Sequence, residues 1–212
     1  MACAYNLLLH FNNPGGTPID SSDAAHTMTL NNSAVIVESP AKFGGGSADV
    51  DAGYIASDAG MGPGTQDFII DFWVYWTGTA TQAPIWSNGF VAGFELDYVG
   101  GSLQWYITGA LPFNQAWSPS TSAWHHIECS RTSGTAYVFT DGVLLGSSFA
   151  NTSDISSSFN FALGDTNRSP DRNQDEFRYI IGTGGHTTNF TPEVSEYCSS
   201  AYIRQQLMKG LG

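Results

Sequence analysis

The chain is poor in positive charge. Lysine and arginine together supply 7 of its 212 residues against 19 aspartates and glutamates, which gives a formal net charge of -12. Proteins that bind a phosphate backbone do so mainly through clustered cations, and the few cations here are scattered along the sequence. We therefore expect no nucleic-acid partner.

Long hydrophobic runs are also missing. No uninterrupted apolar run is longer than the one at residues 72–76, whereas a membrane-spanning helix needs about 20 apolar residues. Residues 1–6 contain no basic segment that leads into an apolar stretch, so we expect no secretory signal. These absences predict a protein that folds in a cytoplasm and has no membrane partner.

Cysteine is scarce. Cys3, Cys129 and Cys198 are far apart in the sequence and odd in number, which argues against a disulfide framework. No Cys-x-x-Cys pair or short Cys/His spacing provides a zinc site. We expect buried or incidental thiols.

Glycine and proline, in contrast, are frequent and separate many short apolar runs. The chain has 24 glycines and 9 prolines, a spacing typical of strands and tight turns rather than helices. The clearest local signal is Asp141-Gly142 between the apolar runs 135–140 and 143–145, which predicts a β-hairpin. Strands are expected at residues 6–11, 34–38, 67–76, 85–87, 91–98, 103–107, 123–131, 135–140, 143–145, 159–164 and 175–180. The predicted fold class is all-β, with two stacked antiparallel sheets.

Polar and glycine-rich segments between these runs predict loops, and a binding site most easily lies on loops. We expect them at residues 14–23, 44–49, 57–65, 110–122 and 165–174. Only residues 199–209 have a helical pattern, and an extended assembly tail is the open alternative. The chain is accordingly divided into one domain, residues 1–193, and a C-terminal tail, residues 194–212.

Eight short motifs occur in the order typical of one fold family. Together they resemble the concanavalin A-like lectin/glucanase superfamily, and within it the laminin-G-like jelly rolls encoded by bacteriophages, over roughly residues 5–193. An Asn-Phe-Thr-Pro close, here at residues 189–192, is also common in those phage proteins. The motifs are Leu-Leu-Leu-His-Phe at 7–11, Asp-Ser-Ser at 20–22, Lys-Phe-Gly-Gly-Gly at 42–46, Asp-Phe-Ile-Ile-Asp-Phe-Trp-Val at 67–74, Trp-His-His-Ile at 124–127, Thr-Asp-Gly at 140–142, Leu-Gly at 163–164 and Asp-Glu-Phe-Arg at 175–178. The resemblance implies a two-sheet jelly-roll sandwich.

The same superfamily includes retaining glycosidases, whose two catalytic glutamates flank an aspartate on one strand. Glu95-Leu-Asp97 matches the first half of that pattern, but Val99 and Gly100 stand where the second glutamate is required. No general acid is then available, so we expect no glycosidase activity and interpret Glu95 and Asp97 as outward-facing strand residues. The sequence has no Gly-x-Ser-x-Gly elbow and nothing in it ties a serine to a histidine, so we expect no enzyme.

Adjacent histidines are also present, at positions 125 and 126. Neighbouring residues on a strand point to opposite faces, so His125 and His126 cannot easily share a ligand. We expect one of them in the core and the other on the surface.

Two further sites follow from the resemblance and the loops. Jelly rolls of this superfamily often hold a structural calcium ion, which implies Asp20 and Asp23 in an N-terminal loop and Asp175 on the penultimate strand as ligands. Turn capping and ion pairing of these carboxylates are the alternative. In the loop 110–122, Phe113 and Trp117 are candidates for contact with a glycan or a protein, or for packing on the sandwich edge.

The resemblance implies a non-enzymatic bacteriophage virion surface protein. A capsid decoration or accessory protein is the leading hypothesis, because no trimeric stem is encoded, and a carbohydrate-binding tail component or adhesin is the alternative. The expected partners are other virion proteins and host surface polysaccharide, with a homo-oligomer left open. The expected location is the virion surface, after assembly in the host cytoplasm.

Overall fold

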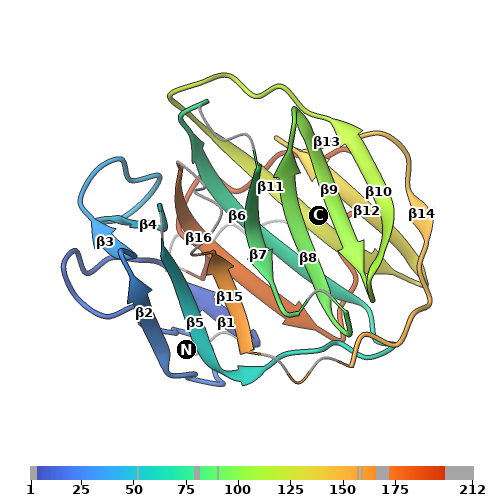
Figure 1. The fold of residues 1–212 in the computed structure, drawn as a ribbon, viewed down its shortest axis with the longest axis horizontal. Coiled ribbons are helices and arrows are strands. Elements are labelled where there is room, and N and C mark those ends of the chain that lie inside the picture. The colour runs from blue at the N-terminus through green and yellow to red at the C-terminus, as the bar shows by residue number, and fades with distance from the viewer. Residues whose placement is uncertain are drawn as a thin grey trace, which may run out of the picture.

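The chain folds as a sandwich of two antiparallel β-sheets (Figure 1). The computed structural model describes residues 4–51, 53–78, 82–89, 91–156, 158, 160–165 and 172–198. The larger sheet has nine strands, β1 (Leu7–Leu9), β3 (Val35–Val37), β4 (Ser47–Asp49), β6 (Phe68–Trp76), β11 (Ala123–Thr132), β12 (Thr135–Thr140), β13 (Val143–Leu144), β14 (Phe149–Ala150) and β16 (Arg172–Ile181). The smaller sheet has seven, β2 (Met28–Asn32), β5 (Gly53–Gly60), β7 (Gln82–Ser87), β8 (Phe94–Val99), β9 (Ser102–Ile107), β10 (Ala110–Ala116) and β15 (Asn160–Gly164). The predicted all-β jelly-roll class is confirmed.

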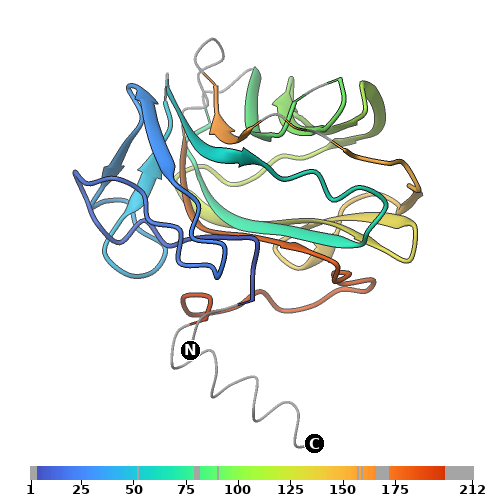
Figure 2. The ribbon, with the colours of Figure 1, turned by 90° about the horizontal axis from the view of Figure 1, so that it is seen from below.

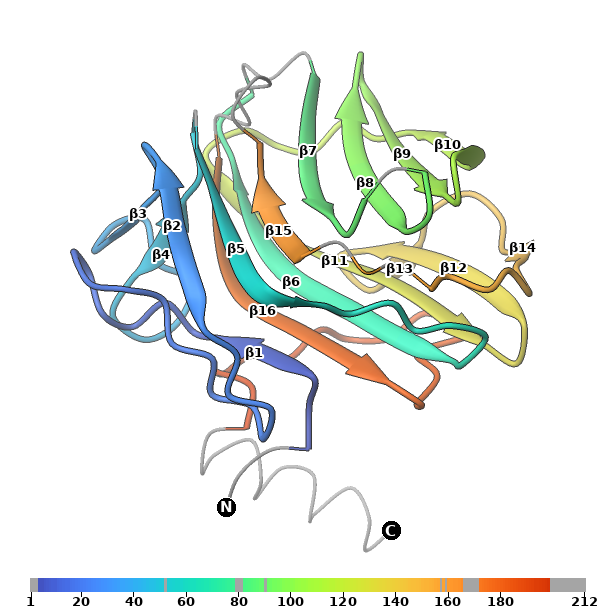
Figure 3. The ribbon, with the colours of Figure 1, turned by 60° about the horizontal axis from the view of Figure 1, so that its bottom comes forward.

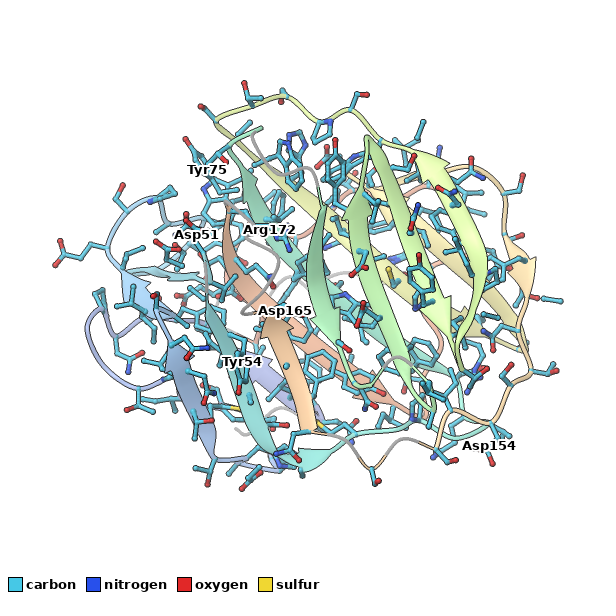
Figure 4. The ribbon with its side chains drawn as sticks, viewed as in Figure 1. Asp51, Tyr54, Tyr75, Asp154, Asp165 and Arg172 are labelled. Atoms are coloured by element: carbon cyan, nitrogen blue, oxygen red, sulfur yellow. The ribbon has the colours of Figure 1, made fainter. Side chains whose placement is uncertain are left out.

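The core lies between the sheets and contains residues of both; Figure 4 shows the side chains that the strands carry, seen onto the face of the sheets. On β6, Phe68, Ile70 and Phe72 alternate inward and belong to the main hydrophobic cluster, as the period-2 geometry of a strand requires. The labelled Tyr75 and Arg172 mark one end of the paired strands β6 and β16, in the upper left of the view. Among the described residues, no helix is long and apolar enough to cross a membrane.

Four segments predicted as loops contain strand residues. Residues 44–49 end with β4, residues 57–65 include the second half of β5, residues 110–122 begin with β10, and residues 165–174 end with the first residues of β16. β10 pairs with β9 alone and is therefore the edge strand of the smaller sheet, where Pro112 costs no central ladder hydrogen bond. The turn-like composition of 110–116 thus concealed an edge strand. The predicted helix 199–209 lies outside the described residues.

The predicted hairpin at Asp141-Gly142 is confirmed. The two residues join β12 to β13 with φ values of 51° and 76°, the left-handed conformation that a two-residue hairpin turn requires. A β-carbon on Gly142 would lie 2.0 Å from the carbonyl oxygen of Phe190. The turn is therefore also in contact with a segment near the C-terminal end of the chain.

That segment, residues 182–198, is called the strap. Figure 2 shows it running beneath the nine-stranded sheet, on the side away from the smaller sheet, and Figure 3 shows β1 lying alongside β16 near the end of the strap's path. Its last described residues include Tyr197, which is fully buried and packs with Leu8 of β1. Packing thus continues past residue 193, the boundary we placed between domain and tail.

The strap also corrects the expectation about disulfides. Cys198 is disulfide-bonded, whereas Cys129 is a free and buried thiol. The expectation of incidental thiols was wrong for Cys198, since wide spacing in the sequence says nothing about which cysteines meet in space. A cross-link at this position fixes the end of the strap covalently.

Candidate functional site

The outer face of the nine-stranded sheet carries an unusual set of buried polar side chains. Strands β6, β11 and β16 lie side by side in the sheet, and their outward positions hold Asp71, His126, Glu128 and Arg178, all buried. The strap crosses this face and leaves a cavity of about 310 Å³. We call this cavity the sheet-face pocket; its lining residues are Asp71, His126, Arg178, His186, Phe190, Thr191 and Glu193.

An ion pair forms the floor of the pocket. The Nε of Arg178 donates to Oδ1 of Asp71 at 2.7 Å, and Nη2 donates to Oδ2. Burial alone would raise the pKa of Asp71, but the guanidinium charge and the hydrogen bonds from His126 and Arg178 outweigh it and lower the pKa to about 2. Asp71 is therefore ionised at every pH at which the protein is expected to work.

His126 has one satisfied and one unsatisfied ring nitrogen. Its Nε2 lies 3.1 Å from the hydroxyl of Tyr197, which in turn donates to Oδ2 of Asp71 at 3.2 Å. Its Nδ1 is buried and has no hydrogen-bond partner among the described residues. A buried polar atom without a partner is costly, so a ligand hydroxyl that reached Nδ1 would gain a hydrogen bond that the protein alone does not supply.

The strap side of the pocket is held by His186. Its backbone N–H donates to Oε1 of Glu128 at 2.9 Å and its Nδ1 lies 2.7 Å from Oε2, a contact that raises the pKa of His186. The ring of Phe190 stacks on His186 with centroids 3.6 Å apart. These contacts fix the apolar wall opposite the charged floor.

Two of the three predicted calcium ligands, Asp20 and Asp23, lie in the N-terminal loop. Oδ1 of Asp20 accepts the N–H groups of Leu8 and Ser22 and Oδ2 accepts that of His26, so this carboxylate is a turn cap. Asp23 is exposed. In the part of the chain that the structure describes, no group of three or more His, Cys, Asp or Glu residues is placed to hold a metal ion.

Asp175, the third predicted ligand, is buried beneath the loop before β4. It accepts the N–H groups of Lys42 and Phe43 on Oδ2 and that of Glu176 on Oδ1. Burial, reinforced by the neighbouring charge of Glu176, raises the pKa of Asp175 to about 7 despite these donors. Its oxygens are thus directed at backbone donors and not at a shared point with Asp20 or Asp23.

Phe113 and Trp117 pack inside the molecule. Their side chains are 3% and 6% exposed and belong to the main core cluster. Trp117 packs edge-on against Trp76, with ring centroids 5.4 Å apart, and Phe113 lies beside Phe149 at 6.0 Å. Neither ring presents a face to solvent, so we do not carry these residues into the proposed site.

A serine does contact a histidine, contrary to our expectation. Oγ of Ser120 lies 3.1 Å from Nε2 of His125, whose Nδ1 lies 2.7 Å from Oδ2 of Asp141. However, Nε2 also lies 3.0 Å from the carbonyl oxygen of Ser120, so both ring nitrogens face acceptors. The hydrogen bond to Asp141 raises the pKa of His125, and the contacts at both nitrogens hold the loop against its strand. The sequence held no signal for this contact, because it depends on a loop that folds back onto its own strand.

The other expectations about catalytic residues concern β8 and β11. Phe94 and Leu96 point into the core, so Glu95 and Asp97 lie on the opposite face of β8, as we predicted, but both are buried there. His125 and His126 do point to opposite sides of β11, but both are buried, because the strap covers the face that we expected to be open.

Sequence reasoning missed the sheet-face pocket. One signal was available: Asp71 is a charged residue in the middle of Phe68–Trp76, a strand that is otherwise apolar on both faces. A carboxylate in such a strand requires a partner. Nothing in the sequence identified that partner as Arg178, which is 107 residues away.

Comparison with known proteins agrees with this architecture. Residues 47–181 match the family model described as the Concanavalin A-like lectin/glucanases superfamily, and no curated protein matches the chain. Among solved structures it is similar to the receptor binding domain of botulinum neurotoxin type G, with 16% identity over 97% of this chain and 52% of that one, at a TM-score of 0.64. It is also similar to the binding domain of Paraclostridial Mosquitocidal Protein 1, with 13% identity over 86% and 50% of the two chains and a TM-score of 0.67.

A third similar structure is the binding domain of botulinum neurotoxin DC in complex with SialylT, with 12% identity over 99% and 52% of the two chains and a TM-score of 0.62. The chain thus spans about half the length of the solved structures that it matches. At these identities the likeness establishes the fold.

Proposed function

Because this chain belongs to the concanavalin A-like lectin/glucanase superfamily, we propose that it is a lectin-like binding domain that holds glycans in the sheet-face pocket. The observation that carries this proposal is the cavity of about 310 Å³ lined by His126, a residue whose buried Nδ1 has no hydrogen-bond partner among the described residues. Ligand pockets have volumes of roughly 300–1,000 Å³, so the cavity suits one or two sugar rings. Carboxylate, imidazole and hydroxyl groups beside the ring of Phe190 provide polar and apolar contacts together.

The similar structures support a binding role in general terms. They are binding domains, and one of them was solved with SialylT. The incomplete glycosidase pattern at Glu95 and Asp97, together with the acceptors that face both ring nitrogens of His125, favours binding without turnover.

We place this binding activity on a bacteriophage particle. The resemblance to phage-encoded jelly rolls motivates the placement, and a disulfide at Cys198 suits a particle surface outside the reducing cytoplasm. A capsid decoration or accessory protein with a lectin-like jelly roll and a tail adhesin are the two positions to distinguish. Immunogold labelling of intact particles separates them, because label over the head indicates decoration and label on the tail indicates attachment.

The pocket itself is tested with a glycan array probed by two threonine variants. Thr191→Val removes a hydroxyl from the pocket lining, whereas Thr152→Val removes an exposed hydroxyl elsewhere. Loss of one hydrogen bond corresponds to about a 2- to 10-fold weaker binding, which we expect for Thr191→Val alone. Equal binding by both variants would show that the glycan binds outside this pocket.

A further inference from the structure

We infer that the sheet-face pocket selects uncharged, hydroxyl-rich sugars and discriminates against sugars that carry a carboxylate. This inference rests on the proposed glycan-binding function and specifies the chemical class of the ligand. Its basis is the arrangement of charge around the pocket.

The positive groups at the pocket already have anionic partners. The guanidinium of Arg178 is bound by both oxygens of Asp71, and its plane lies over the ring of Tyr197 at 4.0 Å. The imidazole of His186 is bound by Glu128. An incoming carboxylate would have to compete with these protein carboxylates for each cation.

The formal charge of the site is negative. Asp71 and Glu193 line the pocket and Glu128 lies behind His186, against one guanidinium, so the formal charge of the site is about -2 with His186 neutral and about -1 with His186 protonated. The site lies in a chain whose net charge is -12. Buried and partly buried carboxylates are poorly screened by solvent, so a second anion in the cavity is repelled.

Hydroxyl groups, in contrast, match the available atoms. A hydroxyl donates to a carboxylate such as Asp71 and also exchanges hydrogen bonds with Nδ1 of His126 or the hydroxyl of Thr191. A ligand carboxylate only accepts, so it leaves the acceptors of the pocket unsatisfied. The polar atoms of the pocket are therefore suited to a neutral sugar.

The test is a glycan array of matched pairs, in which each neutral oligosaccharide stands beside the same oligosaccharide bearing a carboxylate. We expect the wild-type domain to bind the neutral members at least tenfold more tightly at pH 7 and low salt, with a smaller ratio at high salt. In Glu193→Gln we expect a smaller ratio of the affinity for the neutral sugar to the affinity for its carboxylate-bearing partner. In Glu38→Gln, which removes an exposed charge elsewhere, it should stay unchanged.

The outcomes separate this inference from the function on which it rests. Equal or tighter binding of the carboxylate members would overturn the inference while leaving glycan binding intact. If Glu193→Gln prefers neutral sugars as strongly as Glu38→Gln does, the assignment of this preference to the sheet-face pocket would be overturned. Failure of every pair to bind would reject the proposed function itself, and the inference with it.

Discussion

At the residue scale, the buried ion pair between Asp71 and Arg178 makes the folded state sensitive to the loss of either partner. Asp71 and Arg178 are 2% and 8% exposed, and the Asp71 carboxylate also accepts a hydrogen bond from the hydroxyl of Tyr197. The attraction between buried charges roughly offsets their loss of hydration, so the pair itself adds little net stability. Removal of a single partner is different, because it leaves a buried charge without compensation.

We therefore expect Arg178→Met to lower the free energy of unfolding by about 3–5 kcal/mol and to raise the pKa of Asp71 from about 2. Urea denaturation and a carboxyl-carbon NMR titration measure the two effects. The double variant Asp71→Leu/Arg178→Met should regain most of the loss. A single variant as stable as the wild type would contradict the role of this pair.

At the element scale, the strap makes an ordinary β-sandwich face into a pocket. It approaches β11 closely at Gly185, where an added β-carbon would lie 2.5 Å from both Oε1 of Glu128 and Cβ of Ser130. No side chain fits there without displacement of the strap. This close approach is what places His186 and Phe190 over the sheet.

Gly185→Ala should accordingly loosen the strap and cost about 1–3 kcal/mol, since overpacking forces the backbone to shift. Hydrogen exchange should become faster at residues 186–198 and stay unchanged in β9. Gly45→Ala is the matched control, because its β-carbon would make only an ordinary 3.5 Å contact. Unchanged exchange in Gly185→Ala would mean that the strap is not held by this contact.

The elements also show what a sequence can and cannot reveal. Local rules predicted β6 from its apolar pattern and the β12–β13 hairpin from Asp141-Gly142, because both depend on neighbouring residues. They failed for β10, whose composition is that of a turn, and for Trp117, which follows this edge strand and packs against Trp76 in the core. The pocket depends on β6, β11, β16 and the strap, and pairing at such sequence distances leaves no local pattern.

At the scale of the whole molecule, each described histidine lies within ion-pair distance of a carboxylate: His10 with Glu176, His26 with Asp58, His125 with Asp141, His126 with Asp71 and His186 with Glu128. Burial lowers the pKa of His10, but the hydrogen bond and charge of Glu176 outweigh burial, so the pKa is raised. The pKa values of His125 and His186 are raised mainly by their hydrogen bonds to Asp141 and Glu128. Burial raises the pKa of both Asp175 and Glu176.

These shifts predict a protein that is most stable in mild acid. A group with a raised folded pKa stabilises fully below its unfolded pKa, and this contribution is lost as the pH rises through the folded value. For Asp175 the loss spans pH 3.8 to about 7, and for the three histidines it begins above pH 6.5. Asp71 acts in the opposite sense, because its pKa falls from 3.8 to about 2 and its contribution is lost on acidification.

We expect the free energy of unfolding to be greatest between about pH 4 and 6 and to decline toward pH 8. Urea denaturation at a series of pH values measures this profile. In Asp175→Asn the free energy of unfolding should fall less steeply between pH 4 and 7. Other effects of this substitution should change the free energy of unfolding by the same amount at every pH. A maximum at pH 8 or above would contradict the assigned pKa shifts.

The claim that the sheet-face pocket binds sugar can be checked by chemical-shift mapping, in which amide spectra are recorded while a neutral oligosaccharide identified by the array is added. We predict that the shifted amides cluster at Asp71, His126, Arg178, His186 and residues 190–193. Shifts confined to residues 111–122, or to the outer face of β8 and β9, would contradict the claim and move the binding site to the other side of the sandwich.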